Sequence, residues 1–321
     1  MTAPPSQPAA EPVSHHRAEW LRHAERSNMF WLRVMTWISL RLGRSIGRLV
    51  LHLIALYFLV FGPRARRASK AYLARVLAQR PTWRHCYRHF FSFASTIHDR
   101  VYLINDRHDL FDVTVVGEDV MRDALRDGRG VLLLGAHMGS FEVLRAVGRR
   151  HGGTRVAMVM YEENARKIND ALAAINPAAQ ADIIPLGRVD SMLAVRDRLA
   201  EGAMVGMLGD RTPGDEPTRP VAFLGDVARF PTGPIRMAAM LRRPVLFMTG
   251  LYLGGNRYEV HFERLADFST VTAEGRGKRI DDALGAYVAR LEHHCRRAPY
   301  NWFNFHDFWS GSGSSDDNKT G

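Results

Sequence analysis

The chain from residue 111 onward alternates short apolar runs with segments of helical periodicity. The apolar runs have the length of strands and lie at 113–116, 131–135, 155–160, 182–186 and 204–208. The helical segments that separate several of them lie at 140–150, 165–175 and 191–201. After a Pro- and Gly-rich loop, strand-like and helical patterns continue at 221–224, 233–241, 245–253, 258–264 and 280–297. This alternation predicts an α/β fold with a largely parallel central sheet flanked by helices.

Positive charge is concentrated at the beginning of the chain. The full sequence has 44 Lys and Arg against 33 Asp and Glu, a net charge of +11. Residues 1–80 hold 13 basic and three acidic residues, so they carry +10 of that total. A nucleic-acid-binding protein usually spreads its basic residues over the binding face, whereas this basic block coincides with the most apolar part of the chain. We therefore expect a membrane with an anionic surface as partner, and no nucleic acid.

An apolar segment of helical character extends from about residue 20 to residue 61. If 22–48 is one helix, six arginines share an arc of roughly 100°. They are Arg22, Arg26, Arg33, Arg41, Arg44 and Arg48. The uncharged run that follows, 49–63, has 15 residues, short of the roughly 20 needed to span a bilayer. We interpret the segment as an in-plane or partly inserted anchor; a true span and a helix packed on the protein's own core are the alternatives.

These patterns divide the chain into four parts. A Pro-, Ala- and Ser-rich stretch at 1–14 is expected to be disordered, and a helical, membrane-associating N-terminal region at 15–110 follows it. The α/β core is expected to occupy 111–309. A Gly- and Ser-rich tail at 310–321 is expected to be a flexible end.

His85 and His89 lie about one turn apart within the predicted helices of the N-terminal region, on either side of Cys86. Two imidazoles at this spacing could bind a metal, but no third ligand is nearby. With only two cysteines in the chain, a cysteine-only metal cage is excluded. We therefore interpret these side chains as helix-surface residues and expect no metal.

The segment 131–142 (VLLLGAHMGSFE) carries the most informative chemistry. A buried strand ends at Gly135, and a helix begins near Ser140, which is suited to cap it. His137 then lies in the turn and Glu142 in the first helical turn, so that the carboxylate can reach back to the imidazole. A carboxylate in that place would orient a general base. The alternative is a structural histidine at a strand end. Ser140 lacks the Gly-x-Ser-x-Gly setting of a nucleophile.

Two further clusters follow the predicted strands. Asp210 and Arg211 come directly after the strand 204–208, at the sheet edge where α/β folds bind ligands. An arginine there could hold a phosphate or a developing oxyanion, and a structural Asp–Arg pair is the alternative. Thr232 and Gly233 precede a predicted helix, which a capping role alone would explain.

Taken in order, these segments resemble the lysophospholipid acyltransferase superfamily. The order is strand-His-x4-Glu, strand-Asp-Arg, Phe-x-Gly followed by Pro-Thr-Gly, and then Arg243-Pro-Val. More closely, the chain resembles the bacterial lipid A biosynthesis acyltransferases, the late lauroyl/myristoyl transferases, over about residues 28–309. The resemblance implies a transferase at the cytoplasmic face of the bacterial inner membrane. It would move a fatty acyl group from an acyl-carrier-protein or CoA thioester to a hydroxyl or amine of a lipid acceptor, with no cofactor.

The resemblance also implies roles for individual residues. His137 would be the general base, oriented by Glu142. The residues that it implies for substrate or oxyanion binding are Asn164, Asp210, Arg211, Thr232 and Gly233. A non-catalytic membrane scaffold with the same fold is the competing hypothesis. The presence of His137, Glu142 and Arg211 together argues against it.

The chain departs from the family pattern at two places. The family often has Arg-Pro before Asn164, where this chain has Glu162 and Glu163. The basic pair near the family's ending is replaced here by 303–309 (FNFHDFW). Both departures remove positive charge that could hold phosphate. We therefore predict an acceptor other than a bis-phosphorylated glycolipid, such as an aryl-polyene or amino-acid lipid. The aromatic ending would suit such a chain, or it would simply pack on the core.

Overall fold

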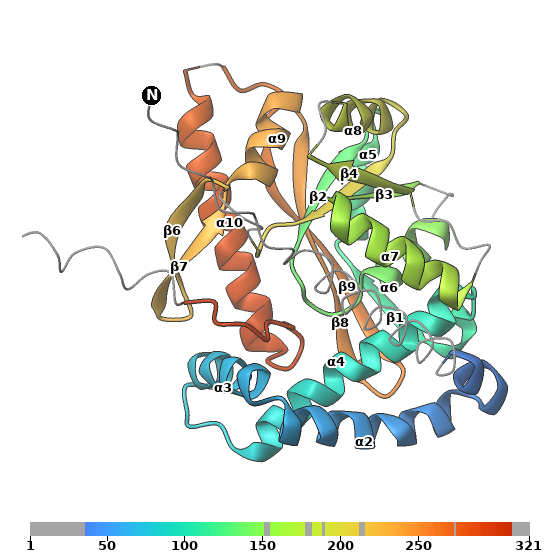
Figure 1. Ribbon diagram of the computed structural model, residues 1–321. Helices are drawn as coiled ribbons and strands as arrows, with labels where there is room; N and C mark the ends of the chain where they lie inside the picture. The colour runs from blue at the N-terminus through green and yellow to red at the C-terminus, as the bar shows by residue number, and fades with distance from the viewer. Residues whose placement is uncertain are drawn as a thin grey trace, which may run out of the picture.

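The computed structural model describes residues 36–150, 155–176, 182–187, 190–211, 216–272 and 274–309. The predicted disordered stretch and the predicted flexible tail lie outside the described residues. Seven strands form a central sheet in the order β1-β9-β8-β2-β5-β3-β4 (Figure 1). Their bounds are β1 Asp112–Val116, β2 Val131–Gly135, β3 Val156–Tyr161, β4 Asp182–Leu186, β5 Met204–Leu208, β8 Pro244–Gly254 and β9 Arg257–Asp267.

The sheet is mostly parallel, which confirms the predicted α/β class. Every neighbouring pair runs parallel except β8 and β9, so β1 and β9 oppose the other five strands. A separate antiparallel hairpin is formed by β6 (Thr218–Phe223) and β7 (Asp226–Pro231). The sequence pattern predicted only part of β6 and none of β7. The reason is that this hairpin is half exposed and lacks the continuous apolar run of a central strand.

Helices cover both faces of the sheet (Figure 1). They are α5 Glu118–Leu125, α6 Phe141–Arg150, α7 Glu162–Ile175, α8 Ser191–Ala200, α9 Gly233–Leu241 and α10 Arg276–Arg297. Alternate residues of β2 point to opposite faces, as the pleat requires. Leu132 and Leu134 belong to the core cluster of α8, α9 and α10, whereas Leu133 belongs to that of α5 and α6. Each buried leucine contributes about 1.5–3 kcal/mol by removal from water.

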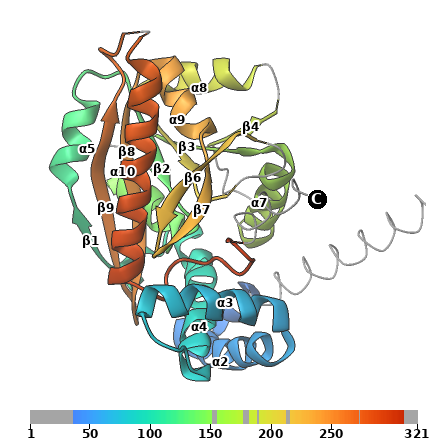
Figure 2. The same ribbon diagram turned by 90° about the vertical axis from the view of Figure 1, so that its left-hand side faces the viewer.

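The N-terminal helices α2 (Arg44–Phe61), α3 (Pro63–Leu77) and α4 (Trp83–Ile104) lie together at one end of the molecule (Figure 2). The predicted helix 22–48 is not continuous. A helical stretch at 36–42 ends at Gly43, whose φ of +84° is a conformation that favours glycine, and α2 begins at the next residue. The part of that predicted helix before residue 36 lies outside the described residues.

Two arginines of the predicted basic arc face the protein and not a membrane. Arg44 forms a bidentate ion pair with the buried Asp99 of α4, at 2.7 and 2.9 Å. The hydroxyl of Tyr258 donates to the same carboxylate at 2.8 Å. Arg48 donates to the hydroxyl of Tyr252 at 3.0 Å. These contacts fasten α2 to α4 and to the β8–β9 hairpin.

The opposite face of α2 is apolar and exposed. Its exposed side chains are Ile46, Leu49, Leu53, Leu56, Tyr57, Phe58, Val60 and Phe61. Among the described residues, α2 is the one helix that is long and apolar enough to cross a membrane, and 22% of it is buried. Its 18 residues measure about 27 Å, slightly less than the hydrocarbon core of about 30 Å.

Candidate active site

The loop after β2 lies directly on strand β8. Gly139 has a φ of +64°, and a Cβ at this position would come within 1.9 Å of the carbonyl oxygen of Gly250. The amide of Ser140 donates to that same oxygen at 2.8 Å. Only glycine permits both the backbone conformation and the close approach. The small residues of the motif therefore fix the loop that carries His137.

His137 is paired with Asp210. Nδ1 of the His137 ring lies 2.9 Å from Oδ1 of Asp210, and the His137 amide donates to Oδ2 at 3.0 Å. Asp210 follows β5, which lies beside β2 in the sheet, so parallel pairing brings the two loops to one edge. The His137 side chain is 33% exposed and that of Asp210 only 1%. Nε2 of His137 has no hydrogen bond among the described contacts and is the ring atom left to exchange a proton.

Asp210 is held as an anion by several donors. Besides His137, the indole N–H of Trp302 donates to Oδ2 at 2.9 Å. Burial would raise the pKa of the Asp210 carboxyl, but the charge and hydrogen bond of His137, the charge of Arg211 and the Trp302 hydrogen bond together lower it to about 2. An ionised Asp210 accepts the proton of His137 Nδ1, which leaves Nε2 as the basic nitrogen.

Glu142 has a different partner from the one expected. Oε1 of Glu142 forms an ion pair with Nε of Arg100 from α4, at 2.8 Å. Glu142 is buried, and its Oε2 has no hydrogen-bond partner. The carboxylate that contacts the His137 ring belongs to Asp210, not to Glu142. The Ser140 hydroxyl, also buried, makes no hydrogen bond, so it does not cap α6.

Arg211 is connected to this site through the C-terminal segment of the chain. Its Nη2 donates to the carbonyl of Phe303 at 2.8 Å, and the amide of Phe303 donates to the carbonyl of His137 at 2.8 Å. Burial lowers the pKa of the Arg211 guanidinium, whereas Asp210 raises it. Trp302 and Phe303 are buried, so the front of the aromatic ending packs on the core. The structure thus brings His137, Asp210, Arg211 and the segment 302–303 together.

Three further predicted site residues, Asn164, Thr232 and Gly233, make no described contact with His137. Asn164 is exposed near the beginning of α7. The amide and hydroxyl of Thr232 both donate to the carbonyl of Pro217, at 3.1 and 3.2 Å. Gly233 is the first residue of α9.

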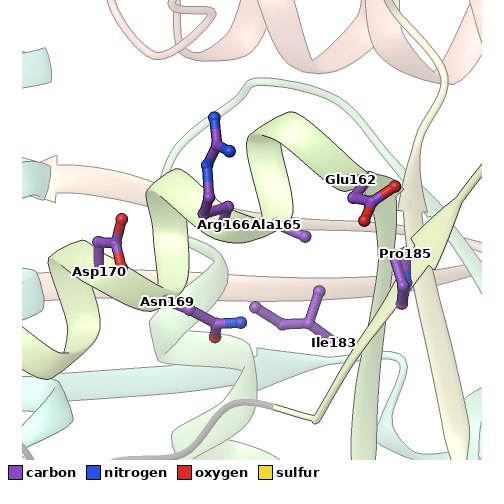
Figure 3. A pocket seen from close by; sticks show the side chains of 7 residues that line it. All are labelled: Glu162, Ala165, Arg166, Asn169, Asp170, Ile183 and Pro185. Atoms are coloured by element: carbon purple, nitrogen blue, oxygen red, sulfur yellow. The ribbon is translucent and has the colours of Figure 1, made fainter. Parts of the chain in front are cut away.

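A groove of about 630 Å³ runs between α7 and the edge strand β4 (Figure 3). Its lining is mixed: Glu162, Arg166, Asn169 and Asp170 are polar, and Ala165, Ile183 and Pro185 are apolar. Strand β4 lies three positions from β2 in the sheet, which corresponds to about 14 Å. The groove is therefore separate from the His137 loop.

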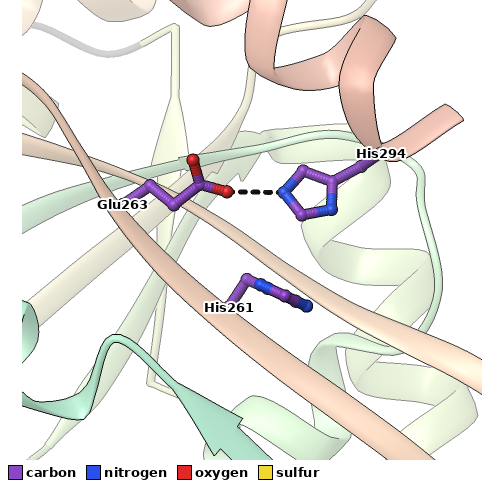
Figure 4. A group of neighbouring side chains, drawn as sticks. All are labelled: His261, Glu263 and His294. Carbon is purple, nitrogen blue, oxygen red and sulfur yellow. Dashed lines mark hydrogen bonds and ion pairs between the residues drawn. The ribbon is translucent and has the colours of Figure 1, made fainter. Parts of the chain in front are cut away.

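A second cluster of titratable groups connects β9 to α10 (Figure 4). Nε2 of His294 lies 2.6 Å from Oε1 of Glu263, and His261 is their neighbour. Two guanidinium groups compensate nearby carboxylates: Arg290 contacts Glu263 at 3.0 Å, and Arg297 contacts Glu259 at 2.5 Å. Arg297 also lies 2.7 Å from Nε2 of His261. The positive charges of Arg290 and Arg297 lie next to the side-chain atoms that would have to bind a cation. The cluster is accordingly a partly buried ion network that fastens α10.

The sequence interpretation missed three contributors to the site. Arg100 was not singled out, and Trp302 was considered only as part of the aromatic ending, because their partners are distant in sequence. His89 was expected on a helix surface, but it is fully buried, as is Cys86. Apolar residues surround His89 in the sequence, at Cys86, Phe90 and Phe93, and this pattern could have indicated a buried helix face.

The sheet is mostly parallel and is covered by helices on both faces, and a His–Asp pair lies at the ends of two neighbouring strands. This arrangement is suited to acyl transfer. The sequence matches the family of bacterial lipid A biosynthesis acyltransferases over residues 15–310. The chain therefore belongs to this family, and in general terms it is a lipid acyltransferase that uses an acyl thioester and a lipid acceptor. No match is found among curated proteins.

Proposed function

We propose that this protein transfers a fatty acyl group to a hydroxyl or amine of a lipid, with His137 as general base and Asp210 as the residue that orients it. The observation that carries the proposal is the His137–Asp210 hydrogen bond, together with the His137 Nε2 that has no described partner. This arrangement also favours an enzyme over a non-catalytic scaffold, since a buried carboxylate paired with an accessible imidazole is the arrangement that a general base needs.

The proposed reaction needs no covalent enzyme intermediate. Nε2 of His137 takes the proton of the acceptor hydroxyl as its oxygen attacks the thioester carbon. The tetrahedral intermediate then collapses, the C–S bond breaks, and His137 returns the proton to the leaving thiolate. One oxyanion donor is worth about 2.7–4 kcal/mol of transition-state stabilisation. Arg211 is the donor that we favour, because both donors of Thr232 are already bonded to Pro217; the Gly233 amide is the alternative.

Glu142 remains in the proposed site with a different task. Arg100 neutralises one of its oxygens, and Oε2 is buried without a partner. A buried carboxylate oxygen without a donor is costly, which favours a substrate group that supplies one. We assign Oε2 to a second donor of the acceptor, either a neighbouring hydroxyl or the second N–H of an amine, because the one proton of the attacking hydroxyl goes to His137.

The class of acceptor provides the test of this function. The ending 303–309 has no lysine or arginine, and Arg211 brings one guanidinium to Phe303. One guanidinium can hold one phosphate, whereas a bis-phosphorylated glycolipid presents two. Given an acyl-carrier-protein or CoA thioester, the purified full chain should acylate a non-phosphorylated hydroxy-lipid faster than a lipid A precursor, measured by mass spectrometry of the products. Acylation of the lipid A precursor alone would refute the charge argument, and acylation of neither lipid would refute the function.

We further propose that α2 lies in the plane of the membrane, at the cytoplasmic face of the bacterial inner membrane. Its apolar face is exposed while Arg44 and Arg48 hold the helix against the body. A helix whose first turns are held in this way would present that face to the lipid and place the site close to the bilayer surface.

Replacing Leu49 and Leu53 together by Glu should weaken binding to anionic lipid vesicles by at least about tenfold. Both side chains are about 70% exposed, so the change removes buried apolar area at the membrane and leaves the fold intact. The measurement is co-sedimentation of the full chain with vesicles. Leu193→Glu on α8 is the matched control, because Leu193 is also exposed. Equal binding of the double variant and the control would place the membrane contact elsewhere.

A further inference from the structure

His89 connects the N-terminal helices to the candidate active site. It lies on α4 with no exposed surface. Its Nδ1 is 2.9 Å from the hydroxyl of Ser69 on α3, and its Nε2 is 2.9 Å from the backbone carbonyl of Trp302. The contacts thus extend from α3 through α4 to the terminal segment, which runs past both helices in Figures 1 and 2.

The two partners determine the protonation of the ring. A backbone carbonyl can only accept, so Nε2 must carry a proton. Burial lowers the pKa of His89 to about 4, against the opposing effect of the Trp302 carbonyl, so the ring is neutral near pH 7. Nδ1 then has no proton and accepts from the Ser69 hydroxyl. Both ring nitrogens are satisfied in this single tautomer.

Trp302 is consequently held from two sides. Its carbonyl accepts from His89, and its indole N–H donates to Oδ2 of Asp210 at 2.9 Å. Tyr72 of α3 packs edge-on against the indole, with ring centroids 5.0 Å apart. The α3–α4 pair therefore fixes the Trp302 indole in part, beside the rings of Phe223, Phe308 and Trp309. The indole in turn is one of the donors that fix the Asp210 carboxylate.

We propose that His89 is a positioning residue for acyl transfer: by fixing Trp302, it keeps the Asp210 carboxylate aligned with His137. The inference rests on the proposed function of His137 and adds a residue outside the α/β core to it. Loss of the hydrogen bond from His89 would leave the buried Trp302 carbonyl with the Asn304 amide, at 2.9 Å, as its described donor, and would remove the link between Trp302 and α4. The substrate makes no contact with His89 in this scheme, so kcat should change and KM should not.

The test compares His89→Leu with His89→Gln in the full-length protein. Glutamine can donate to the Trp302 carbonyl through Nε2 and accept from Ser69 through Oε1, whereas leucine can do neither. His89→Leu should lower kcat by about 10- to 100-fold with KM unchanged, the range seen when a functional histidine in a metal site loses its supporting partner. His89→Gln should keep kcat within about threefold. Equal kcat values for the leucine variant and the wild type would overturn the proposal.

A double-mutant cycle separates positioning from a general loss of stability. Trp302→Phe keeps an aromatic ring but removes the donor to Asp210. If His89 acts through Trp302, the His89→Leu/Trp302→Phe double variant should be no slower than Trp302→Phe alone. Multiplication of the two rate losses would overturn the proposal. If His89→Leu does not fold, the same cycle is measured with His89→Asn, whose shorter side chain cannot span both contacts.

The two hypotheses can fail separately. A fully active His137→Ala variant would refute the proposed function. An inactive His137→Ala variant combined with multiplicative losses at His89 and Trp302 would refute only the role of His89.

Discussion

Replacement of His137 by alanine should reduce turnover by about 10²- to 10⁴-fold, the usual contribution of a general base. The folded state should be retained, because the His137 side chain is one-third exposed and its backbone contacts to Phe303 and Asp210 do not need the ring. Steady-state acyl transfer by the purified full chain, together with its thermal unfolding midpoint, measures both quantities.

His293→Ala is the appropriate control for this variant. His293 is exposed on α10 and belongs to the helix that carries the partly buried ion network. Its replacement should leave turnover unchanged. Wild-type turnover in a folded His137→Ala variant would contradict the assignment of the base, whereas equal losses in both variants would indicate a defect in the preparation or the fold.

The fold was predictable from local pattern because its central strands are short apolar runs with clear ends. The predicted bounds of β2, β4 and β5 coincide with those observed, and β8 and β9 differ only at their ends. The hairpin β6–β7 was harder to predict, because only one of its faces is buried and its residues alternate with polar ones. The hydrophobic periodicity of a sequence indicates which residues are buried, but it does not indicate which strands pair with one another.

The site was only partly predictable for the same reason. Local spacing placed His137 in a loop after a strand, and the structure has it there. The partner of its ring, however, is determined by strand order: β5 lies next to β2, which brings in Asp210 from 73 positions away. Likewise, Arg100 reaches Glu142 only because α4 packs against α6. Neither pairing can be inferred from the spacing of the residues in the sequence.

The arginines of α2 illustrate how a correct pattern can lead to an incomplete interpretation. The sequence indicated one basic side and one apolar side. An anionic membrane was the expected partner of the basic side, but Arg44 has a buried acidic partner in Asp99 within the chain. A buried ion pair is stable only with close geometry and further hydrogen bonds, which Tyr258 and the Gly255 carbonyl supply here. The apolar side is thereby the exposed side of the helix, which is the basis of the proposed membrane contact.

Asp210→Asn should be nearly as damaging as loss of His137, with a decrease in turnover of about 10³- to 10⁴-fold. The reason lies in the donors around the carboxylate. Oδ2 faces two N–H groups, from the His137 backbone and the Trp302 indole, so the single oxygen of asparagine must occupy that place. The amide NH₂ then points at Nδ1 of His137 and donates to it. The proton of the imidazole moves to Nε2, and the ring can no longer act as a base there. A wrong tautomer of this kind costs about 10⁴ in the serine-protease triad.

Glu142→Gln is the decisive comparison for this prediction. If Glu142 oriented His137, as the spacing in the sequence indicated, its amide variant would produce the tautomer defect and Asp210→Asn would be the milder change. The observed pairing predicts the reverse. Glu142→Gln keeps one oxygen for Arg100, leaves the His137–Asp210 pair intact, and should act mainly through the acceptor, as a higher KM with a smaller loss of kcat. Turnover and KM for the two amide variants, measured against the same acceptor, therefore decide which carboxylate holds the base. A larger loss of kcat in Glu142→Gln than in Asp210→Asn would return that role to Glu142.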